Sequence, residues 1–377
     1  MAGIYLHIPF CKRACTYCDF HFVTHLNEKQ RFLNALDIEI QLQPQFLPPG
    51  AVIDTVYFGG GTPSLLSEPE LTGILKALHN NFKLGSEPEI TLECNPDDLT
   101  LENARAFRQA GINRLSIGIQ SFHQEHLKQM NRSHNAHQAI SGIENAKHAG
   151  FENITVDLIY GLPQLSLKQW EQNLETFNTF QIPHLSAYNL TVEPGTPLAH
   201  AVKKKRVSIP DDDFVLQQFN LLMDYMERAG YEHYEISNFA KPGRRSIHNT
   251  NYWMGIPFAG MGPGAHSFDG NHRFYNPPHN KRYLEKLESD DLALVKDSLT
   301  KTDKINELIM IRLRMAEGLP LEKVNALYGK DEELRIAKTA EGFLQSEHLV
   351  LTEKKELQLT RKGKYLADYI TAELFKD

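Results

Sequence analysis

Short runs of β-branched and aromatic residues alternate with longer amphipathic segments along the first half of the chain. The runs with the length and composition of buried strands lie at 3–9, 55–61, 89–96, 114–121, 153–163 and 184–192. Apolar residues recur between them at helical spacing, with Ser67 and Thr100 as expected N-caps and Gly111 and Gly150 at helix ends. This alternation predicts an α/β fold with parallel strands joined by helical crossovers, either a doubly wound sheet or a barrel. Six units also allow an incomplete barrel, and both architectures place function at the carboxyl ends of the strands.

The alternation stops near residue 203. The charged stretch 203–210 is expected to be a solvated loop, followed by a helix near 213–228 and a strand at 233–240. A loop from Lys241 to His248 and a Gly- and aromatic-rich stretch at 251–268 should then cover one side of the barrel.

The last part of the chain has a different pattern. From about residue 302, helical segments lead to two alternating runs, HLVLT and ELQLT, and to a final helix. Helices followed by a hairpin resemble a winged-helix domain of α+β type. We therefore expect three parts: the barrel at 1–202, a linker and flanking segment at 203–300, and the winged-helix-like domain at 301–377.

Composition narrows the function classes. The chain of 377 residues has 40 Lys and Arg against 47 Asp and Glu, a net charge of −7, which argues against a general nucleic-acid binder. The helix before the C-terminal hairpin mixes acidic and basic residues, so a structural or partner-docking role is favoured over DNA binding. No apolar run approaches the ~18 residues of a membrane span and no signal peptide is apparent, so we expect a cytoplasmic protein. Peripheral contact with a membrane surface is compatible with that location.

Three of the four cysteines, Cys11, Cys15 and Cys18, lie within eight residues directly after the first predicted strand. This is no disulfide framework, and clustered thiols indicate a metal or cluster site. Three thiolates can hold three irons of a 4Fe-4S cluster and leave the fourth iron open to the amine and carboxylate of an amino acid. The alternative is a Cys3His zinc site that uses His7 or His21. The remaining Cys94 is expected to be a buried structural thiol.

Polar residues end or follow the next predicted strands. Glycines 59–61 and Thr62 follow the second, Glu93 ends the third, Gln120 ends the fourth and Arg132 lies in the next loop. The fifth strand carries Asp157 within an otherwise apolar run. A structural hydrogen bond explains any one of these residues equally well. Their convergence on one barrel mouth favours a ligand site.

The spacing CxxxCxxC on this pattern of strands resembles the radical S-adenosylmethionine (SAM) superfamily. The resemblance implies a partial (β/α)6 TIM-like barrel, a 4Fe-4S cluster on the three cysteines and exchangeable SAM. In the similar coproporphyrinogen dehydrogenase group, SAM is bound by the residues that match Tyr5, Gly60, Gly61, Thr62, Glu93, Gln120, Arg132 and Asp157. The resemblance further implies that Tyr17 lends its backbone to the adenine, Glu93 holds the ribose and Arg132 holds a carboxylate.

Two features separate the chain from the oxygen-independent coproporphyrinogen dehydrogenases. Phe20 stands where these enzymes carry a further cysteine, and only ten residues precede Cys11 in place of a long N-terminal extension. Both features resemble the HemW family of proposed heme chaperones, which has an HNxxY motif.

That motif reads His248-Asn249-Thr250-Asn251-Tyr252 here. The resemblance implies a motif that matters for heme, and a neutral imidazole is a good iron ligand. His266 is a second candidate, although an isolated histidine among 17 is more often a hydrogen-bonded surface or core residue.

The preferred interpretation is a heme chaperone that transfers heme to acceptor hemoproteins, such as those of the respiratory chain, and carries a 4Fe-4S cluster with SAM. The alternative is an oxygen-independent coproporphyrinogen III dehydrogenase. A zinc-stabilised scaffold is a third class. Whether the protein turns over a substrate is left open by the sequence.

Overall fold

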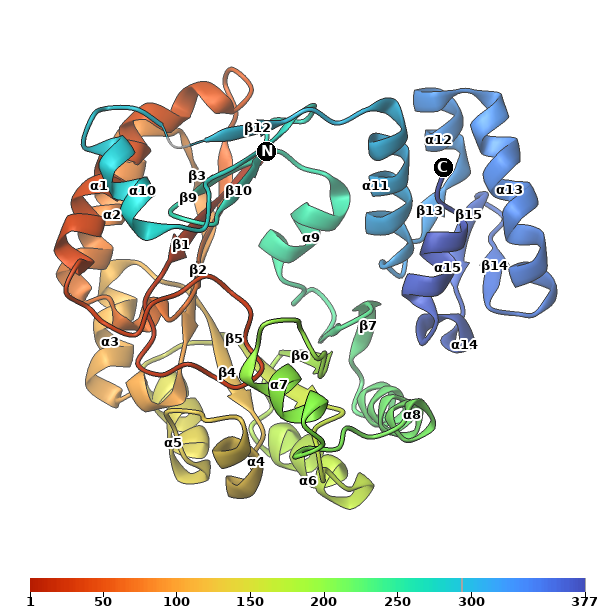
Figure 1. The fold of residues 1–377 in the computed structure, drawn as a ribbon, viewed down its shortest axis with the longest axis horizontal. Helices are drawn as coiled ribbons and strands as arrows, with labels where there is room; N and C mark the ends of the chain where they lie inside the picture. The colour runs from red at the N-terminus through yellow and green to blue at the C-terminus, as the bar shows by residue number, and fades with distance from the viewer. Residues whose placement is uncertain (293, 377) are drawn as a thin grey trace.

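A curved sheet with helices along its outer side makes up the larger part of the molecule (Figure 1). The computed structural model describes residues 1–292 and 294–376. At the centre of the sheet the strands run parallel and follow chain order: β1 (Ala2–Ile8), β2 (Ile53–Gly60), β3 (Leu84–Cys94), β4 (Arg114–Gln120), β5 (Asn153–Tyr160) and β6 (His184–Asn189). They coincide with the predicted runs to within a few residues, except that β3 begins five residues earlier. The α/β class with parallel strands and helical crossovers is confirmed.

The crossover helices are also where the pattern predicts them, at α1 (Lys29–Leu42), α2 (Glu68–Asn81), α3 (Leu101–Ala110), α5 (Ala136–His148) and α6 (Leu167–Thr179). Ser67 caps α2 in a capping box, and Thr100 caps α3 by accepting a hydrogen bond from Asn103 N. Gly111 ends α3 with a φ of 106°, a backbone conformation that favours glycine. Two short helices, α4 (Gln124–Gln129) and α7 (Pro197–Lys203), were not predicted because one or two turns give too little periodicity.

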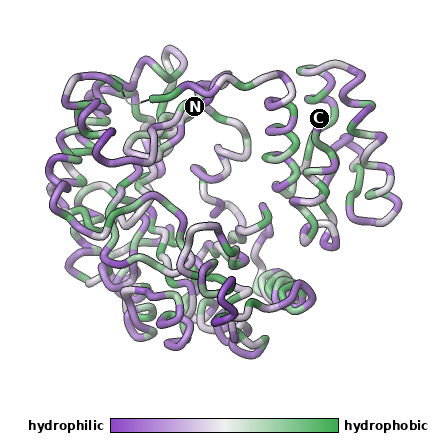
Figure 2. The backbone as a smooth tube through the Cα atoms, in the orientation of Figure 1, coloured by the Kyte–Doolittle hydropathy of each residue, from purple (hydrophilic) through white to green (hydrophobic). Residues whose placement is uncertain are grey.

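The two faces of the parallel strands differ in chemistry. Ile4 and Leu6 of β1 are fully buried under the helices, whereas Tyr5 and His7, which alternate with them, belong to the opposite face. The same alternation runs through the neighbouring strands, so the concave face is lined by polar and aromatic side chains. Figure 2 shows many hydrophilic stretches along the outer helices. The apolar core lies between these helices and the sheet. Cys94 is buried in this core, as predicted.

The segment after residue 203 extends the sheet at both edges. Its elements are α8 (Asp212–Arg228), β7 (Glu232–Glu235), β8 (Asn238–Ala240), α9 (Ile247–Met254), β9 (Phe258–Met261), β10 (His266–Phe268), β11 (Arg273–Tyr275), α10 (Asn280–Leu287) and β12 (Val295–Asp297). In the described part of the chain the sheet has twelve strands in the order β12-β11-β10-β9-β1-β2-β3-β4-β5-β6-β8-β7.

Three expectations for this segment need correction. The predicted strand at 233–240 is an antiparallel hairpin of β7 and β8, and the loop expected up to His248 ends where α9 begins at Ile247. The stretch at 251–268 does more than cover one side, because β9 pairs in parallel with β1. Strands of three or four residues are too short to show a period, so only their pairing in the fold reveals them.

The C-terminal part forms a second layer with its own apolar core. It contains α11 (Lys301–Leu313), β13 (Leu319–Pro320), α12 (Leu321–Tyr328), α13 (Lys330–Gln345), β14 (Leu349–Leu351), β15 (Glu356–Leu359), α14 (Arg361–Lys364) and α15 (Ala367–Glu373). The strands form a small antiparallel sheet in the order β13-β15-β14, in agreement with a winged-helix-like arrangement. In Figure 1, α9 lies between the large sheet and α11, and it contacts both. The domain boundaries at 202 and 300 stay predictions. Among the described residues, no helix is long and apolar enough to cross a membrane.

Candidate functional site

The loop that carries the three clustered cysteines follows β1 at its carboxyl end. The loop is held at both sides by backbone hydrogen bonds, from Cys11 N to Val23 O over 2.9 Å and from Thr16 N to Met130 O over 3.1 Å. Cys11, Cys15 and Cys18 are all partly exposed. Three partly exposed sulfurs on one anchored loop are therefore available to a ligand.

Two donors reach the sulfurs from other loops. Thr62 Oγ1 donates to Cys11 Sγ over 3.4 Å, and Arg132 Nη1 donates to Cys15 Sγ over 3.4 Å. Burial raises the pKa of Cys11 and raises that of Cys18 to about 11, so the free thiols resist ionisation. Bound iron would keep the sulfurs as thiolates, and the hydroxyl and guanidinium donors would stabilise that charge. The donor set fits a cluster with three thiolate ligands.

The two histidines of the zinc alternative have other partners. His7 Nδ1 lies 3.2 Å from Tyr5 Oη, and His7 Nε2 lies 2.8 Å from His21 O. His21 Nε2 is 2.6 Å from Asn280 Oδ1. In the described ranges, no three His, Cys, Asp or Glu side chains surround one position for a single ion. A cubane cluster has no such requirement, because each thiolate binds a different iron.

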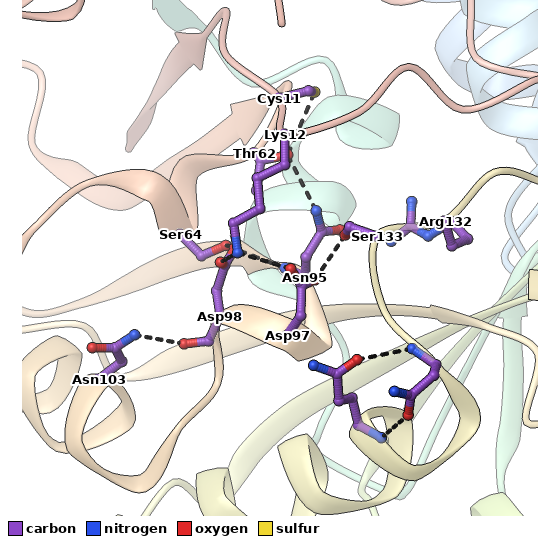
Figure 3. A network of polar contacts seen from close by, with 12 residues as sticks. Cys11, Lys12, Thr62, Ser64, Asn95, Asp97, Asp98, Asn103, Arg132 and Ser133 are labelled. Atoms are coloured by element: carbon purple, nitrogen blue, oxygen red, sulfur yellow. Dashed lines mark hydrogen bonds and ion pairs between the residues drawn. The ribbon is translucent and has the colours of Figure 1, made fainter. Parts of the chain in front are cut away.

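Arg132 and Asn95 join the donors into one network (Figure 3). Arg132 Nη2 donates to Asn95 Oδ1 over 2.6 Å and to Gly118 O over 2.8 Å. Asn95 Nδ2 in turn donates to Thr62 Oγ1 over 3.3 Å. The side chains that contact Cys11 and Cys15 are thereby positioned together. Sequence reasoning missed Asn95, although its place directly after the third strand was the available signal.

An ion-pair cluster joins the same loop to the turn after β3. Lys12 Nζ contacts Asp97 Oδ2 at 2.8 Å and also pairs with Asp98 (Figure 3). Ser64 Oγ donates to Asp98 and Ser133 Oγ donates to Asp97, over 2.7 and 2.8 Å respectively. These contacts tie the cysteine loop to the turn after β3. The Asp pair at 97–98 was also missed.

The glycines after β2 permit a close approach of two chain segments. Gly60 has a φ of 108°, and a Cβ on it would stand 2.8 Å from His7 Nδ1. A Cβ on Gly61 would stand 2.6 Å from Phe10 O. Any larger residue would push the chain that enters the cysteine loop. Contact of Gly60 and Gly61 with SAM stays a prediction.

Two carboxylates lie on the concave face of the sheet. Glu93 on β3 accepts a hydrogen bond from Tyr57 Oη over 2.8 Å, and Asp157 on β5 accepts one from Ser116 Oγ over 3.3 Å. Burial, together with the nearby charge of Asp157, raises the pKa of Glu93 to about 7, and burial raises the pKa of Asp157 to about 6. The structure thus places Asp157 on the inward face, as expected.

The remaining predicted SAM residues lie close to these groups. Tyr5 stacks on Tyr57, with ring centroids 6.1 Å apart. Gln120, with a φ of 65°, ends β4 where the pairing with β5 shifts register. Tyr17 packs against the apolar core, and burial raises the pKa of its hydroxyl beside the charge of Arg132. The structure therefore places Tyr5 beside Tyr57, Gln120 at the carboxyl end of β4, and Tyr17 in the cysteine loop beside Arg132.

The HNxxY motif occupies a different place. His248 is the second residue of α9 and is 2% exposed. Its ring stacks on Tyr57 at 4.9 Å and meets Tyr252 edge-on at 4.8 Å between centroids. Nδ1 lies 2.8 Å from Thr55 Oγ1, and Nε2 has no hydrogen-bond partner within the described residues. Burial lowers the pKa of His248 to about 3, so the imidazole is neutral.

This position leaves the predicted heme role of His248, Asn249 and Tyr252 untested. His248 Nε2 is enclosed in this conformation, so iron cannot reach it without a rearrangement of the surrounding side chains or backbone. Asn249 lies beside it on α9 and is partly buried. His266, the other candidate, is exposed on β10 and stacks on Tyr275, with ring centroids 5.6 Å apart.

A buried charged pair holds α9 against the sheet. Glu89 Oε1 accepts the backbone N–H of His248 over 3.0 Å, and Glu89 Oε2 lies 3.7 Å from Arg114 Nε. Arg114 is 1% exposed and also donates to Thr155. Sequence reasoning missed this pair, although two charged residues at the starts of apolar runs were a usable signal.

Comparisons with known proteins agree with the fold and the cysteine loop. The family model "Radical SAM superfamily" matches residues 5–177, and "HemN C-terminal domain" matches residues 299–366. The solved structure of coproporphyrinogen III oxidase (HemN) from Escherichia coli superposes on the chain with a TM-score of 0.85 at 23% identity. The match covers 100% of this chain and 90% of the HemN chain. That likeness shows the fold. The matched families and the site together define the radical SAM class.

Full-length relatives narrow the class further. Proteins named heme chaperone HemW from Bacillus subtilis and Mycobacterium tuberculosis are 32% and 34% identical to the chain. These alignments cover 98% and 99% of this chain and 98% and 94% of the relatives. A third, from Escherichia coli, is 33% identical over 96% of the chain. The chain belongs to the HemW family within the radical SAM superfamily, and the family implies a 4Fe-4S cluster and SAM.

Proposed function

We propose that this protein binds heme and transfers it to acceptor hemoproteins, and that it does so as a carrier of a 4Fe-4S cluster with exchangeable SAM. One observation carries the proposal: relatives named heme chaperone HemW align with the chain from end to end at 31 to 34% identity. The setting of the three cysteines supports the cofactor part independently, since hydroxyl and guanidinium donors already face two of the sulfurs.

The protein's own residues would divide the work of holding the cofactors. Cys11, Cys15 and Cys18 would each bind one iron and leave the fourth iron to the amine and carboxylate of SAM. When bound, the cluster supplies one electron to the sulfonium. Arg132 is already charged and hydrogen-bonded beside Cys15, so its guanidinium suits a carboxylate. Glu93 would accept hydrogen bonds from the ribose hydroxyls.

The other predicted SAM contacts complete this arrangement. Gly60 and Gly61 would bring backbone close to the methionyl amine, with Thr62 beside them. Tyr17 would lend its backbone to the adenine. The further side chains proposed to line the SAM site are Tyr5, Gln120 and Asp157.

The heme part of the proposal assigns the motif His248, Asn249 and Tyr252, with exposed His266 as the second candidate, to heme binding. The acceptors would be hemoproteins such as those of the respiratory chain. The proposal places the protein in the cytoplasm, where thiols stay reduced. Contact with a membrane surface would then be peripheral.

Anaerobic reconstitution with iron and sulfide tests the cluster. The wild-type protein should gain iron-sulfur absorption and about four irons per chain, and Cys15→Ala should lose both. Cys94→Ala is the matched control, because Cys94 is buried in the core and should not change the iron content. Equal iron in the wild type and Cys15→Ala would contradict the assignment, and zinc without sulfide would support the scaffold class instead.

Hemin titration followed by transfer tests the heme part. The reconstituted protein should shift the Soret band of hemin and pass heme to an apo-hemoprotein, with His248→Ala and His266→Ala identifying the ligand. No Soret change with the wild-type protein would remove the chaperone proposal. Conversion of coproporphyrinogen III to protoporphyrinogen IX in the same preparations would instead support the dehydrogenase alternative.

A further inference from the structure

His248 belongs to a chain of side-chain contacts that ends at Glu93. Thr55 Oγ1 and His248 Nδ1 are 2.8 Å apart, which fixes the rotation of the imidazole. The imidazole lies almost parallel to the Tyr57 ring, with centroids 4.9 Å apart and planes inclined by 25°. Tyr57 Oη then donates to Glu93 Oε1 over 2.8 Å. The placement of the carboxylate thus depends on a tyrosine whose ring rests on His248.

Two rings lie nearly parallel to the ring of Tyr57. Tyr5 faces it from β1 at 6.1 Å and His248 faces it from α9 at 4.9 Å, so the nearer support comes from the helix. Tyr252, one turn along α9, presses edge-on against His248 at 4.8 Å. The imidazole is therefore packed between Tyr57 and Tyr252 and cannot change its position without moving Tyr57.

The helix that carries His248 is itself fixed to the sheet. Glu89 on β3 accepts the first backbone N–H groups of α9, from Ile247 over 3.3 Å and from His248 over 3.0 Å. A carboxylate at this end of a helix is favoured by the helix dipole. Arg114 pairs with Glu89 at 3.7 Å and is itself buried. These contacts fix the position of His248 relative to strands β2 and β3.

We propose that His248 is a positioning residue of the SAM site, which supports the Tyr57 ring and through it orients the Glu93 carboxylate. This rests on the proposed function, because Glu93 is the residue assigned to the ribose. Without the imidazole, one face of Tyr57 loses its packing and the phenol gains freedom to turn. The hydroxyl then no longer holds Glu93 in one orientation, and the cofactor has to order both side chains on binding.

The chain offers a matched control in His184. This histidine is also buried on the concave face, with Nδ1 3.1 Å from Thr155 Oγ1 and Nε2 2.8 Å from Tyr234 Oη. Like His248 it combines a strand threonine with a tyrosine, but its tyrosine does not contact Glu93 by any hydrogen bond within the described residues. His184→Ala should disturb packing to a similar extent and leave SAM affinity unchanged.

The experiment measures SAM affinity by equilibrium dialysis on reconstituted protein of verified iron content. His248→Ala should weaken binding roughly tenfold, the factor that corresponds to about one charge-assisted hydrogen bond. His248→Phe keeps a flat ring on Tyr57 and should restore affinity to within about threefold of wild type. Tyr57→Phe should match His248→Ala, and the double variant should be no weaker than Tyr57→Phe alone, because both act through one hydrogen bond.

Several results would overturn the proposal. Wild-type affinity in His248→Ala, an equal loss in His248→Phe and His248→Ala, or additive losses in the double variant would each contradict it. If His248→Ala does not fold, Thr55→Val releases the imidazole more gently, and an unchanged affinity in that variant contradicts the proposal too.

The proposed function fails in a different way. Wild-type protein with full iron that binds no SAM would refute the cofactor assignment before any variant is compared. Loss of hemin binding in His248→Ala with unchanged SAM affinity would make His248 a heme ligand and refute its positioning role.

Discussion

Glu39 offers the sharpest test of how the fold supports the cysteine loop. This residue of α1 is fully buried, and its two carboxylate oxygens accept hydrogen bonds from four donors. Oε2 accepts from Gly262 N at 2.8 Å and from Tyr283 Oη at 2.7 Å. Oε1 accepts from Asn276 Nδ2 at 2.7 Å and from Gln43 Nε2 at 3.3 Å. The perturbation is Glu39→Gln, which keeps the shape and replaces one oxygen by an NH2 group.

The magnitude follows from which neighbours can adapt. The Tyr283 hydroxyl can rotate to accept from the new amide, but the Gly262 backbone N–H can only donate. One buried donor is thus left facing another, at ~1–3 kcal/mol, and the remaining bonds lose their charge assistance. We expect a loss of about 2 to 4 kcal/mol in the free energy of unfolding.

The effect should reach the cysteine loop. Gly262 follows β9, which pairs with β1, and a Cβ on Gly262 would stand 2.3 Å from His7 O. Weakening the hold of Glu39 on Gly262 therefore loosens the backbone that leads to Cys11. We expect Glu39→Gln to retain less iron after reconstitution although no ligand is changed.

Urea unfolding followed by circular dichroism measures the stability, and hydrogen exchange at 260–264 locates the loss. Asp37→Asn is the matched control on the same helix, because Asp37 is exposed and accepts a single hydrogen bond, from Gln41 Nε2 over 2.9 Å. The control should stay within about 0.5 kcal/mol of wild type. A midpoint for Glu39→Gln equal to that of Asp37→Asn would refute the reasoning.

Three further predictions concern the site and the C-terminal part. Because the pKa of Glu93 is raised to about 7, its carboxylate forms as the pH rises through that value, so SAM affinity should increase about tenfold from pH 6 to 8; a flat profile in wild type, or a profile that survives Glu93→Gln, would contradict this. Thr62→Val removes the donor to Cys11 Sγ and should lower the reduction potential of the reconstituted cluster, since hydrogen bonds to sulfur favour the reduced state; spectroelectrochemical titration would expose an unchanged potential. Ile309→Ala, at a fully buried position of α11, should cost about 2 to 5 kcal/mol. Met310→Ala on the exposed side should cost under about 1 kcal/mol, and equal thermal midpoints for the two variants would speak against the core assigned to α11.

Sequence reasoning succeeded where the chemistry of a residue is local. The period of apolar residues located the parallel strands, and Ser67 and Thr100 cap the helices that they were expected to begin. Asp157 could be placed on the concave face because a carboxylate in an apolar strand must avoid the core. Phe20 is among the exposed residues of the cysteine loop, where its side chain is not packed into the core.

It failed where a role depends on distant partners. Glu89 and Arg114 are separated along the chain, and only strand pairing places them 3.7 Å apart under α9. Asn95 gains its importance from Arg132, which arrives from another loop. His248 was interpreted from its motif alone, and the packing of α9 on β2 reveals its contact with Tyr57.

The order of apolar and polar residues by itself determined the α/β alternation, the helix ends and the grouping of three thiols on one loop, because each depends on neighbours within a few residues. Tertiary structure decided which strands form the sheet edges and which side chains reach the sulfurs and the carboxylates. Those choices depend on burial and hydrogen-bond geometry between segments far apart in the chain. Local spacing carries no information about them until the sheet curves and brings the segments together.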